Sequence, residues 1–361
     1  MKNLAGSHIL NILQRKKHQY FILLSSQNWL NNKMTVVKFL TNILMDCSIV
    51  SNTSAKFTPT NGCFFVVNSA FILIHSVSQG GGAVFCQNIN CNLSIYECSF
   101  SQVTCASQKN GGAIFFDCQS GGEFLMKCST GSKCQTGDSG TNYELGQFIL
   151  SYVSNSKKNT IEDLSIQQCS ISTVGKRAGS IYFGYGDQVS SRINSSYNSV
   201  YYHSSIVYLY AKSLVSNYYC SYCCSSQHSI CINFCGGLNF SFRFSNVVSN
   251  SQQQNLYGIL INGGTSGLDT TTTISSCIFV GNHNRLFHRA GGRMNIYNSY
   301  IQTSYSSNGA SIFSTITVSD PQEFTVMLIN CFNMNKEITK NIFSSIIRFK
   351  NFFILFNFLF Y

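Results

Sequence analysis

Short runs in which apolar and polar residues alternate occur along most of the chain. The clearest runs cover residues 94–100 and 165–171, and both follow the pattern Ser-Ile-x-x-Cys-Ser-apolar. Strict alternation is typical of a half-buried β-strand, because successive side chains point to opposite faces. No sustained apolar spacing of three and four residues occurs between residues 60 and 330, so the pattern predicts strands rather than helices.

The alternating runs share a Cys or Ser near their end, followed by another apolar residue. The anchor positions are Cys47, Ser69, Cys98, Cys128, Cys169, Ser245, Cys277, Ser299 and Cys331. Their spacing lies between 22 and 41 residues, apart from one step of 76. Repeats of roughly 20 to 50 residues indicate solenoids, propellers or arrays. A propeller blade needs about 40 residues, so coils of strand, turn and strand predict an all-β parallel β-helix.

Two tetrapeptides, Gly81-Gly82-Ala83-Val84 and Gly111-Gly112-Ala113-Ile114, are thirty residues apart. Glycine is the residue that turns a chain most readily, so these tetrapeptides predict corners between coils. They precede strands, and no Gly-Lys-Ser/Thr follows them, so they differ from phosphate-binding loops. Only two prolines, Pro59 and Pro321, interrupt the backbone donors.

These observations predict a β-helix of about ten coils over residues 41–335. Residues 1–40 form an N-terminal flanking segment or cap, and residues 336–361 form an apolar C-terminal tail. The last ten residues are too few to cross a bilayer, which needs about 20. Three interpretations of the tail stay open: it caps the last coil, it begins a membrane span of a longer chain, or it is an incidental end. Membrane association through the tail is therefore undecided, and the first 26 residues make a poor secretory signal.

The net charge of +11 is concentrated outside the repeats. Residues 1–59 hold seven Lys/Arg and one acid (+6), residues 60–330 hold thirteen and eleven (+2), and residues 331–361 hold four and one (+3). A nucleic-acid-binding domain carries a basic stripe on its folded face. The near-neutral repeats have no such stripe, so we expect no nucleic-acid partner.

The chain has 17 cysteines, and six of them occupy the anchor position. We expect these six, Cys47, Cys98, Cys128, Cys169, Cys277 and Cys331, to form a ladder of buried thiols with the serines, since free Cys behaves as a small buried hydrophobe. A second dense group comprises Cys220, Cys223, Cys224, Cys231 and Cys235, with His228 between them. Its short spacings leave local disulfides, free thiols and a zinc site open.

Catalytic chemistry has few candidates in the repeats. Enzymes that act on polysaccharides use paired carboxylates, and the nearest pairs are Asp117 with Glu123 and Glu162 with Asp163. Glu162 and Asp163 are adjacent on a predicted strand, so we expect them on opposite faces. Asp117 and Glu123 flank a predicted turn. We therefore expect no catalytic residues, no cofactor and no metal, and we keep an enzyme that uses Asp117 and Glu123 as the alternative.

The two Gly-Gly-Ala tetrapeptides resemble the GGA[ILV] motif of polymorphic outer membrane protein repeats, and 178–181 is similar to a degenerate third copy. That family pairs the motif with F-x-x-N, which occurs here five times, ending at Asn42, Asn68, Asn88, Asn282 and Asn335. The chain also resembles the cysteine-containing β-helix families of protist surface proteins. The resemblance implies a right-handed β-helix and a surface or adhesion role.

From these features we expect a non-enzymatic β-solenoid outside the cell or on its surface, with glycans or cell-surface proteins as candidate partners. The alternative is a carbohydrate-active lyase or hydrolase. Four N-glycosylation sequons, at Asn52, Asn92, Asn194 and Asn239, are compatible with secretion.

Overall fold

A computed structural model describes residues 47–51, 53–87, 90–137, 144–170, 177–222, 224–229, 231–237, 239–252, 259–263, 271–283, 285–301, 307–308 and 311–312. The chain divides into two units, Met1–Ser48 and Ile49–Tyr361. In the described ranges, every regular element is a β-strand. The predicted segments 1–40 and 336–361 lie outside the described residues.

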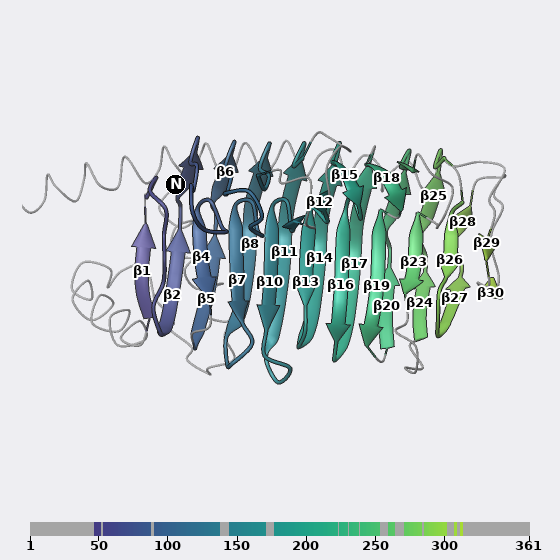
Figure 1. The fold of residues 1–361 in the computed structure, drawn as a ribbon. Coiled ribbons are helices and arrows are strands. Elements are labelled where there is room, and N and C mark those ends of the chain that lie inside the picture. The colour runs from purple at the N-terminus through teal and green to yellow at the C-terminus, as the bar shows by residue number, and fades with distance from the viewer. Residues whose placement is uncertain are drawn as a thin grey trace, which may run out of the picture. The chain divides into compact units, whose positions relative to one another are not determined.

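The strands form three parallel sheets that share the coils of a solenoid (Figure 1). Sheet A has 16 strands. Eleven of them follow one another in order: β1 (Cys47–Ser51), β2 (Gly62–Val67), β5 (Cys91–Tyr96), β8 (Glu123–Ser132), β11 (Lys158–Gln167), β14 (Asp187–Ser196), β17 (Ser213–Tyr222), β20 (Asn239–Arg243), β24 (Thr271–Ser275), β27 (Arg293–Tyr297) and β30 (Ser311–Ile312). Five short strands continue the same sheet beyond a bend: β3 (Ala70–Ile72), β6 (Ser99–Ser101), β21 (Asn246–Val248), β25 (Ile278–Val280) and β28 (Tyr300–Ile301).

Sheets B and C complete the coils. Sheet B consists of β4 (Val84–Gln87), β7 (Ile114–Cys118), β10 (Ile149–Val153), β13 (Ile181–Gly184), β16 (Ile206–Ala211), β19 (Ile232–Gly237), β23 (Leu260–Gly263), β26 (Phe287–Arg289) and β29 (Ser307–Asn308). Sheet C consists of β9 (Glu144–Leu145), β12 (Arg177–Ala178), β15 (Ser199–Tyr202), β18 (Ser225–Ser229) and β22 (Ser251–Gln252). The chain passes through B, A and, in five coils, C before it re-enters B. This order confirms the predicted parallel β-solenoid, and the nine described strands of sheet B are slightly fewer than the ten coils expected.

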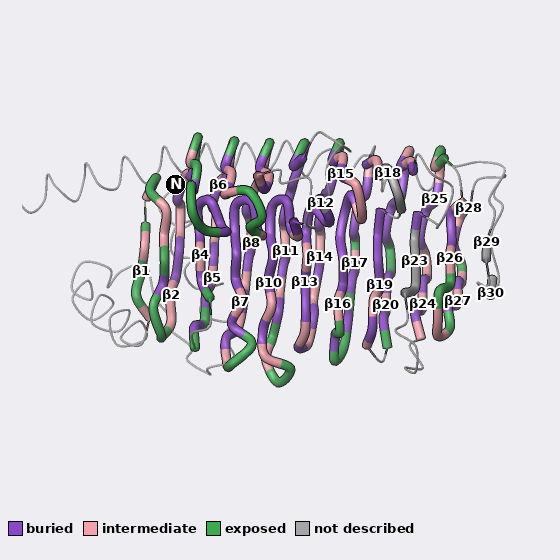
Figure 2. The backbone as a smooth tube through the Cα atoms, in the orientation of Figure 1, coloured by how far each residue is buried: buried purple, intermediate pink, exposed green. Residues whose placement is uncertain are grey.

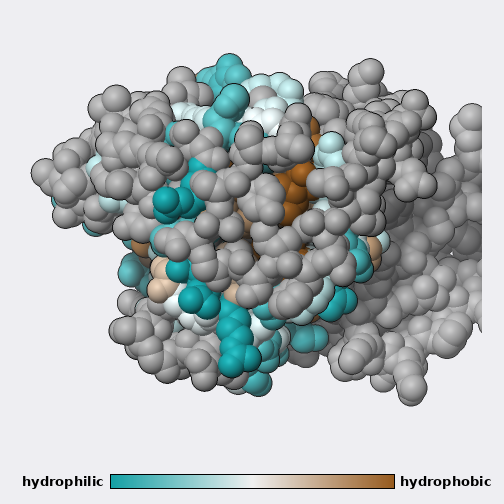
Figure 3. Space-filling view, turned by 90° about the vertical axis from the view of Figure 1, so that its right-hand side faces the viewer, coloured by the Kyte–Doolittle hydropathy of each residue, from teal (hydrophilic) through white to brown (hydrophobic). Residues whose placement is uncertain are grey.

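Stacks of identical or similar side chains fill the interior. Ile149, Ile181, Ile206 and Ile232 occupy one register position of sheet B in four consecutive coils, and all four are fully buried. Phe71 and Phe100 stack with ring centroids 4.9 Å apart. The buried residues follow the strands, and the exposed residues collect at turns and corners (Figure 2). Figure 3 views the stack of coils from its β30 end, and brown hydrophobic residues are visible among the described residues. Burial of these ladders supplies the main driving force for the fold.

Each coil bends sharply where the long part of sheet A meets its short part. The bend is made by one left-handed residue with φ between 44° and 55°. Continuing the strand registers through the bend aligns these residues in one column, which we name the outer corner column: Asn68, Glu97, Cys128, Asp163, Arg192, Tyr218, Phe244, Ser276 and Asn298.

The next residue of each coil points inward and is often Ser or Cys. We name this the inner corner column: Ser69, Cys98, Ser129, Leu164, Ile193, Tyr219, Ser245, Cys277 and Ser299. Ser129 Oγ donates to the Lys127 carbonyl at 2.9 Å and accepts a hydrogen bond from the Cys98 amide at 3.2 Å. Ser245 and Ser299 repeat both contacts. A small buried side chain with a donor and an acceptor thus satisfies backbone groups that the bend removes from the sheet ladder.

A second bend follows the short strands and has its own left-handed residues, including Gln102, Lys133, Gln168 and Tyr197. The inward residues after this bend include Cys134, Cys169 and Cys224, with Asn198, Asn250 and Asn282 at the same position. Asn198 Oδ1 accepts from the Cys169 amide at 2.7 Å, and Asn250 Oδ1 accepts from the Cys224 amide at 2.9 Å. Asparagine and cysteine therefore line the second bend from inside.

The prediction of one cysteine register is wrong in three places. Cys98 and Cys277 lie in the inner corner column, but Cys169 lies at the second bend. Cys128 lies in the outer corner column, where it takes a left-handed conformation and is only partly buried. Cys47 is disulfide-bonded, as is Cys63. The two bends have the same local pattern, so a sequence alignment on Cys or Ser merges them. Cys331 lies outside the described residues.

The Gly-Gly-Ala tetrapeptides mark corners before sheet B, as predicted. Gly111 has φ +66°, and a Cβ there would lie 2.3 Å from the Ile114 carbonyl oxygen. Val84 and Ile114 are paired in register, and the ladder continues through Ile149 to Ile181. The corner at 146–149 is therefore an equivalent that the motif search missed, because Gln147 and Phe148 replace the second glycine and the alanine.

Candidate functional site

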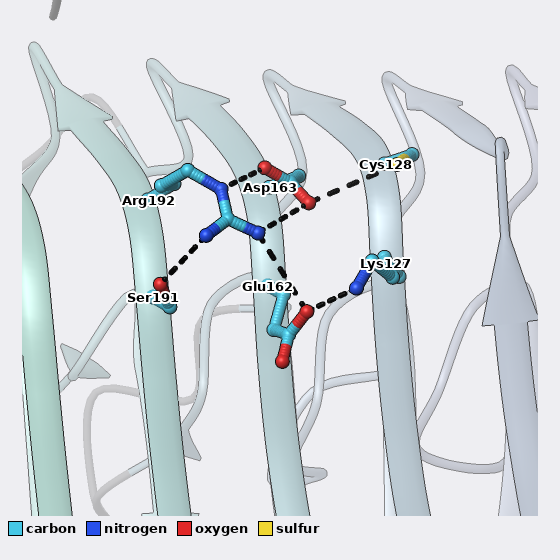
Figure 4. Close-up of polar contacts among 6 residues, drawn as sticks. All are labelled: Lys127, Cys128, Glu162, Asp163, Ser191 and Arg192. Atoms are coloured by element: carbon cyan, nitrogen blue, oxygen red, sulfur yellow. Dashed lines mark hydrogen bonds and ion pairs between the residues drawn. The ribbon is translucent and has the colours of Figure 1, made fainter. Parts of the chain in front are cut away.

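A group of charged contacts on sheet A joins residues of the outer corner column to the residues that directly precede the column (Figure 4). Lys127 and Glu162 form an ion pair across neighbouring strands. Arg192 Nε and Nη2 donate to the two carboxylate oxygens of Asp163, the second at 2.9 Å. Arg192 Nη2 also lies 3.7 Å from Glu162 Oε2. We name these four residues the charged ladder.

The charged ladder is largely self-neutralising. Its side chains are exposed by 12 % for Lys127, 26 % for Glu162, 24 % for Asp163 and 42 % for Arg192. The hydrogen bonds to Asp163 raise the pKa of Arg192 further above its ordinary value. Two cations face two carboxylates, so this group orders the surface of three coils without leaving a net charge for a ligand.

The expectation that Glu162 and Asp163 face opposite sides is wrong. Both side chains lie on the outer side and both contact Arg192. Asp163 has φ 54°, and one left-handed residue shifts the alternation of side chains by one position. Alternation applies only to extended backbone, so the sequence could not show that this strand bends between its two acids.

Further along the same column, the charged residues are replaced by aromatic ones. Tyr218 and Phe244 stack with ring centroids 5.4 Å apart and an interplanar angle of 19°. Their exposed fractions are 51 % and 37 %. Arg243 precedes Phe244, is exposed, and is paired in register with Asn217. An aromatic surface with an adjacent guanidinium can bind planar or amphipathic ligands.

Exposed aromatic residues occur at bends between residues 197 and 244. The aromatic residues with the largest exposed fractions there are Tyr197, Tyr210, Tyr218 and Phe244, and all four have positive φ. Bulky residues rarely adopt this conformation. The bends therefore project these rings outward from the sheets, where they contribute little to the core.

A second aromatic group lies on the outer side of sheet B. Tyr185 and Tyr210 stack at 5.7 Å, and Tyr152 contacts Tyr182 and Tyr185 edge to face. Burial raises the pKa of Tyr182 to about 12. Burial also raises the pKa of Tyr152, and the nearby Tyr182 adds to that effect. Tyr152, Tyr182 and Tyr185 are more buried than the Tyr218–Phe244 pair, and only Tyr210 of this group is exposed, by 39 %.

Two of these rings pack directly against a glycine of the neighbouring strand. A Cβ at Gly184 would lie 2.5 Å from the ring of Tyr152, and a Cβ at Gly236 would lie 2.5 Å from the ring of Tyr210. Each ring therefore lies flat over the next strand of sheet B, where any larger residue would displace it.

Asp117 and Glu123, the alternative catalytic pair, lie on different sheets. Asp117 is on β7 of sheet B and accepts a hydrogen bond from Gln119 Nε2 at 3.0 Å. Glu123 begins β8 of sheet A, and its Oε1 lies 3.9 Å from Lys157 Nζ. Each carboxylate is partly exposed and has a partner of its own, so the described contacts do not bring the two together.

The free cysteines are mostly buried and their thiols are poor nucleophiles. Burial raises the pKa of Cys98 and of Cys277 to about 12. Cys86 Sγ and Cys118 Sγ lie 3.0 Å apart, and this contact raises the pKa of Cys86. Reactive thiols need a lowered pKa and access to solvent, so these residues are core residues rather than nucleophiles.

The dense cysteine group divides between two sheets. Cys220, on β17, is buried, as are Cys224 and Cys231, and Cys235, on β19, is partly buried. Burial raises the pKa of Cys231 above its ordinary value. Cys223 lies outside the described residues, as does the side chain of His228. Within the described ranges, no group of three or more His, Cys, Asp or Glu residues is arranged to hold a metal ion.

The sequons differ in exposure. Asn92 and Asn239 are exposed, whereas Asn194 is only 3 % exposed, and Asn52 lies outside the described residues. A glycan needs a side-chain amide that is open to solvent, so the folded solenoid can carry one at Asn92 and Asn239 but not at Asn194.

No protein-family model, no curated protein and no solved structure matches this chain. A search of the described part of the chain for a helix of the length and apolarity needed to cross a membrane finds none. The F-x-x-N copies that can be placed do not share one position: Asn68 lies in the outer corner column and Asn282 at the second bend.

The sequence did not single out Arg192, Tyr218, Phe244 or Arg243. One signal was available for two of them, because Arg243 and Phe244 directly precede the anchor Ser245. Arg192 and Tyr218 lie in the 76-residue step that contains no anchor. The missing information was that the residue before the anchor is left-handed and points out.

Proposed function

We propose that this protein is a non-enzymatic β-solenoid of the cell surface that binds glycans or cell-surface proteins through its outer side. The observation that supports this proposal is the placement of exposed aromatic residues at the bends, where Tyr197, Tyr210, Tyr218 and Phe244 project from successive coils. Aromatic residues and arginine are the residues most enriched at binding hot spots.

The recurring residues of the chain support the non-enzymatic part. Ser129, Ser245 and Cys277 donate hydrogen bonds to backbone carbonyls inside the bend. The residues of the charged ladder form ion pairs with one another. The recurring Ser and Cys residues thus serve stacking, and the outer side carries the wider range of residue types. A rigid scaffold with a variable surface is typical of solenoid proteins that bind along an extended face.

The test is binding by the intact protein. Purified full-length protein is applied to an array of neutral and acidic glycans and, separately, to cells, and surface exposure is measured by labelling intact cells that express it. Selective binding together with surface labelling is the expected result. Uniform absence of binding, or labelling only after the cells are lysed, contradicts the proposal.

The same preparation tests the enzyme alternative. Wild-type protein and an Asp117→Asn, Glu123→Gln double variant are incubated with polysaccharides, and reducing ends and unsaturated products are measured. We expect no product from either protein. Product from the wild type that the double variant does not form would favour the enzyme.

A further inference from the structure

The aromatic pair of the outer corner column is not explained by folding. Tyr218 and Phe244 belong to adjacent coils and stack along the solenoid, yet about half of Tyr218 and over a third of Phe244 stay exposed, at 51 % and 37 %. Aromatic residues stabilise a fold chiefly by the apolar area that they bury. Tyr218 and Phe244 therefore stabilise the fold less than fully buried aromatic residues would.

The backbone at these two residues is also unfavourable for them. Tyr218 has φ 55° and Phe244 has φ 50°. Among non-glycine residues, Asn and Asp adopt this conformation most readily, and the same column has Asn68, Asp163 and Asn298 elsewhere. Bulky residues that keep a disfavoured conformation while exposed point to a functional constraint.

The charge beside the rings is positive. Arg243 directly precedes Phe244, and its register partner Asn217 directly precedes Tyr218. The ion pairs among the described residues involve Lys127, Lys157 and Arg192 but not Arg243. Two adjacent coils thus present two stacked rings, the exposed guanidinium of Arg243 and the amide of Asn217 on the same side.

This combination fits an acidic sugar. A pyranose ring has an apolar face of C–H groups that packs on an aromatic ring, and a uronate adds a carboxylate that a guanidinium can bind in bidentate fashion. Stacked strands are about 4.8 Å apart, so the two rings lie along the direction in which a sugar chain would extend. A polynucleotide would also stack on aromatic rings, but it requires a basic groove, and the repeats carry only +2 over residues 60–330.

We propose that Tyr218, Phe244 and Arg243 form a binding site for a glycan that contains uronate residues. The site rests on the proposed function and specifies the ligand class and the residues that bind it. The two aromatic rings hold the sugar faces, and Arg243 selects for the carboxylate.

The site is tested with polygalacturonate and with its fully methyl-esterified form, which keeps the backbone and removes the charge. Binding of the full chain is measured by biolayer interferometry for wild type, for a Tyr218→Asn, Phe244→Asn double variant, and for Arg243→Gln. Asparagine suits left-handed backbone, so the double variant keeps the fold. We expect about tenfold or greater loss of polygalacturonate affinity in the double variant and about fivefold loss in Arg243→Gln.

Matched controls separate the site from general surface effects. Leu73→Asn removes an apolar residue that is 72 % exposed and has positive φ at the second bend, and Arg289→Gln removes an exposed arginine of sheet B. Both controls should bind polygalacturonate as the wild type does. Circular dichroism melting curves of all variants check that the solenoid stays folded.

The failures of the site and of the proposed function are distinguishable. If the wild type binds other glycans or cells but the double variant binds polygalacturonate equally well, the site is wrong and the proposed function stands. Equal affinity for the methyl ester, or tighter binding of single-stranded DNA than of polygalacturonate, also overturns the site. If the wild type binds neither glycans nor cells, the proposed function itself fails.

Discussion

The inner and outer corner columns are one residue apart in the sequence and differ in almost every respect. Six of the nine inner residues are Ser or Cys, and each bonds both the carbonyl two residues earlier in its own coil and a backbone group of a neighbouring coil. The outer column holds Asn, Asp, Glu, Cys, Arg, Ser, Tyr and Phe. The inner residue is restricted because buried backbone groups need a partner, whereas the outer residue meets solvent and can vary. Repetition therefore marks the residues that stack the coils, and variation marks the surface available for binding.

The largest effect is expected inside the bend. Ser129→Val leaves the Lys127 carbonyl and the Cys98 amide without the partner that Ser129 Oγ now provides. Leaving buried polar groups unsatisfied costs about 2–3 kcal/mol in total. Chemical denaturation should show this loss in the free energy of unfolding. Its matched control is Cys128→Asn, one residue earlier, which should change stability by less than about 0.5 kcal/mol. Equal losses in both variants would remove the distinction between the columns.

A pH effect on stability is expected next, from the buried thiols. Burial raises the pKa of Cys98 and of Cys277 to about 12 in the folded protein, whereas the unfolded chain titrates at roughly 8.5. The unfolded chain therefore loses these protons first as the pH rises. The stability contribution of the neutral thiols is complete below about pH 8.5 and is lost between there and about pH 12.

Denaturation in a reducing buffer from pH 7 to pH 11 measures this effect. We expect the free energy of unfolding to fall steadily above about pH 8.5. A Cys98→Ser, Cys277→Ser variant replaces both thiols with serine, the residue that the inner corner column already has at Ser129 and Ser299. The free energy of unfolding of this variant should fall less steeply with pH. An identical pH profile for the variant would show that these thiols are not the cause.

The smallest effect is expected on the outer side. Arg192→Ala removes the contacts to Asp163 and Glu162, but the Arg192 side chain is 42 % exposed. Partly exposed ion pairs contribute about 0.5–1 kcal/mol, and salt screens them. The loss of stability measured by denaturation should therefore shrink when the ionic strength rises. A loss above that of Ser129→Val would place the charged ladder among the main determinants of the fold.

The sequence alone predicted most of the architecture. Alternation at residues 94–100 and 165–171, the coil-length spacing of the anchors and the glycine corners indicated a parallel solenoid, and the structure confirms this class. These features are local or periodic, and a stack of equivalent strands makes them repeat. The presence of a bend was not predicted, because a left-handed Cys128, Arg192 or Tyr218 has no distinctive residue type, unlike a left-handed glycine.

The sequence by itself determined that coils stack and that Ser and Cys recur inside them. Only the tertiary structure decided which residues share a column: it separates Cys169 from Cys98, places Glu162 and Asp163 on one side, and brings Tyr218 against Phe244. The physical reason is that one residue with positive φ reverses the order of inward and outward side chains. That reversal depends on the backbone hydrogen bonds between coils, and no single coil contains them.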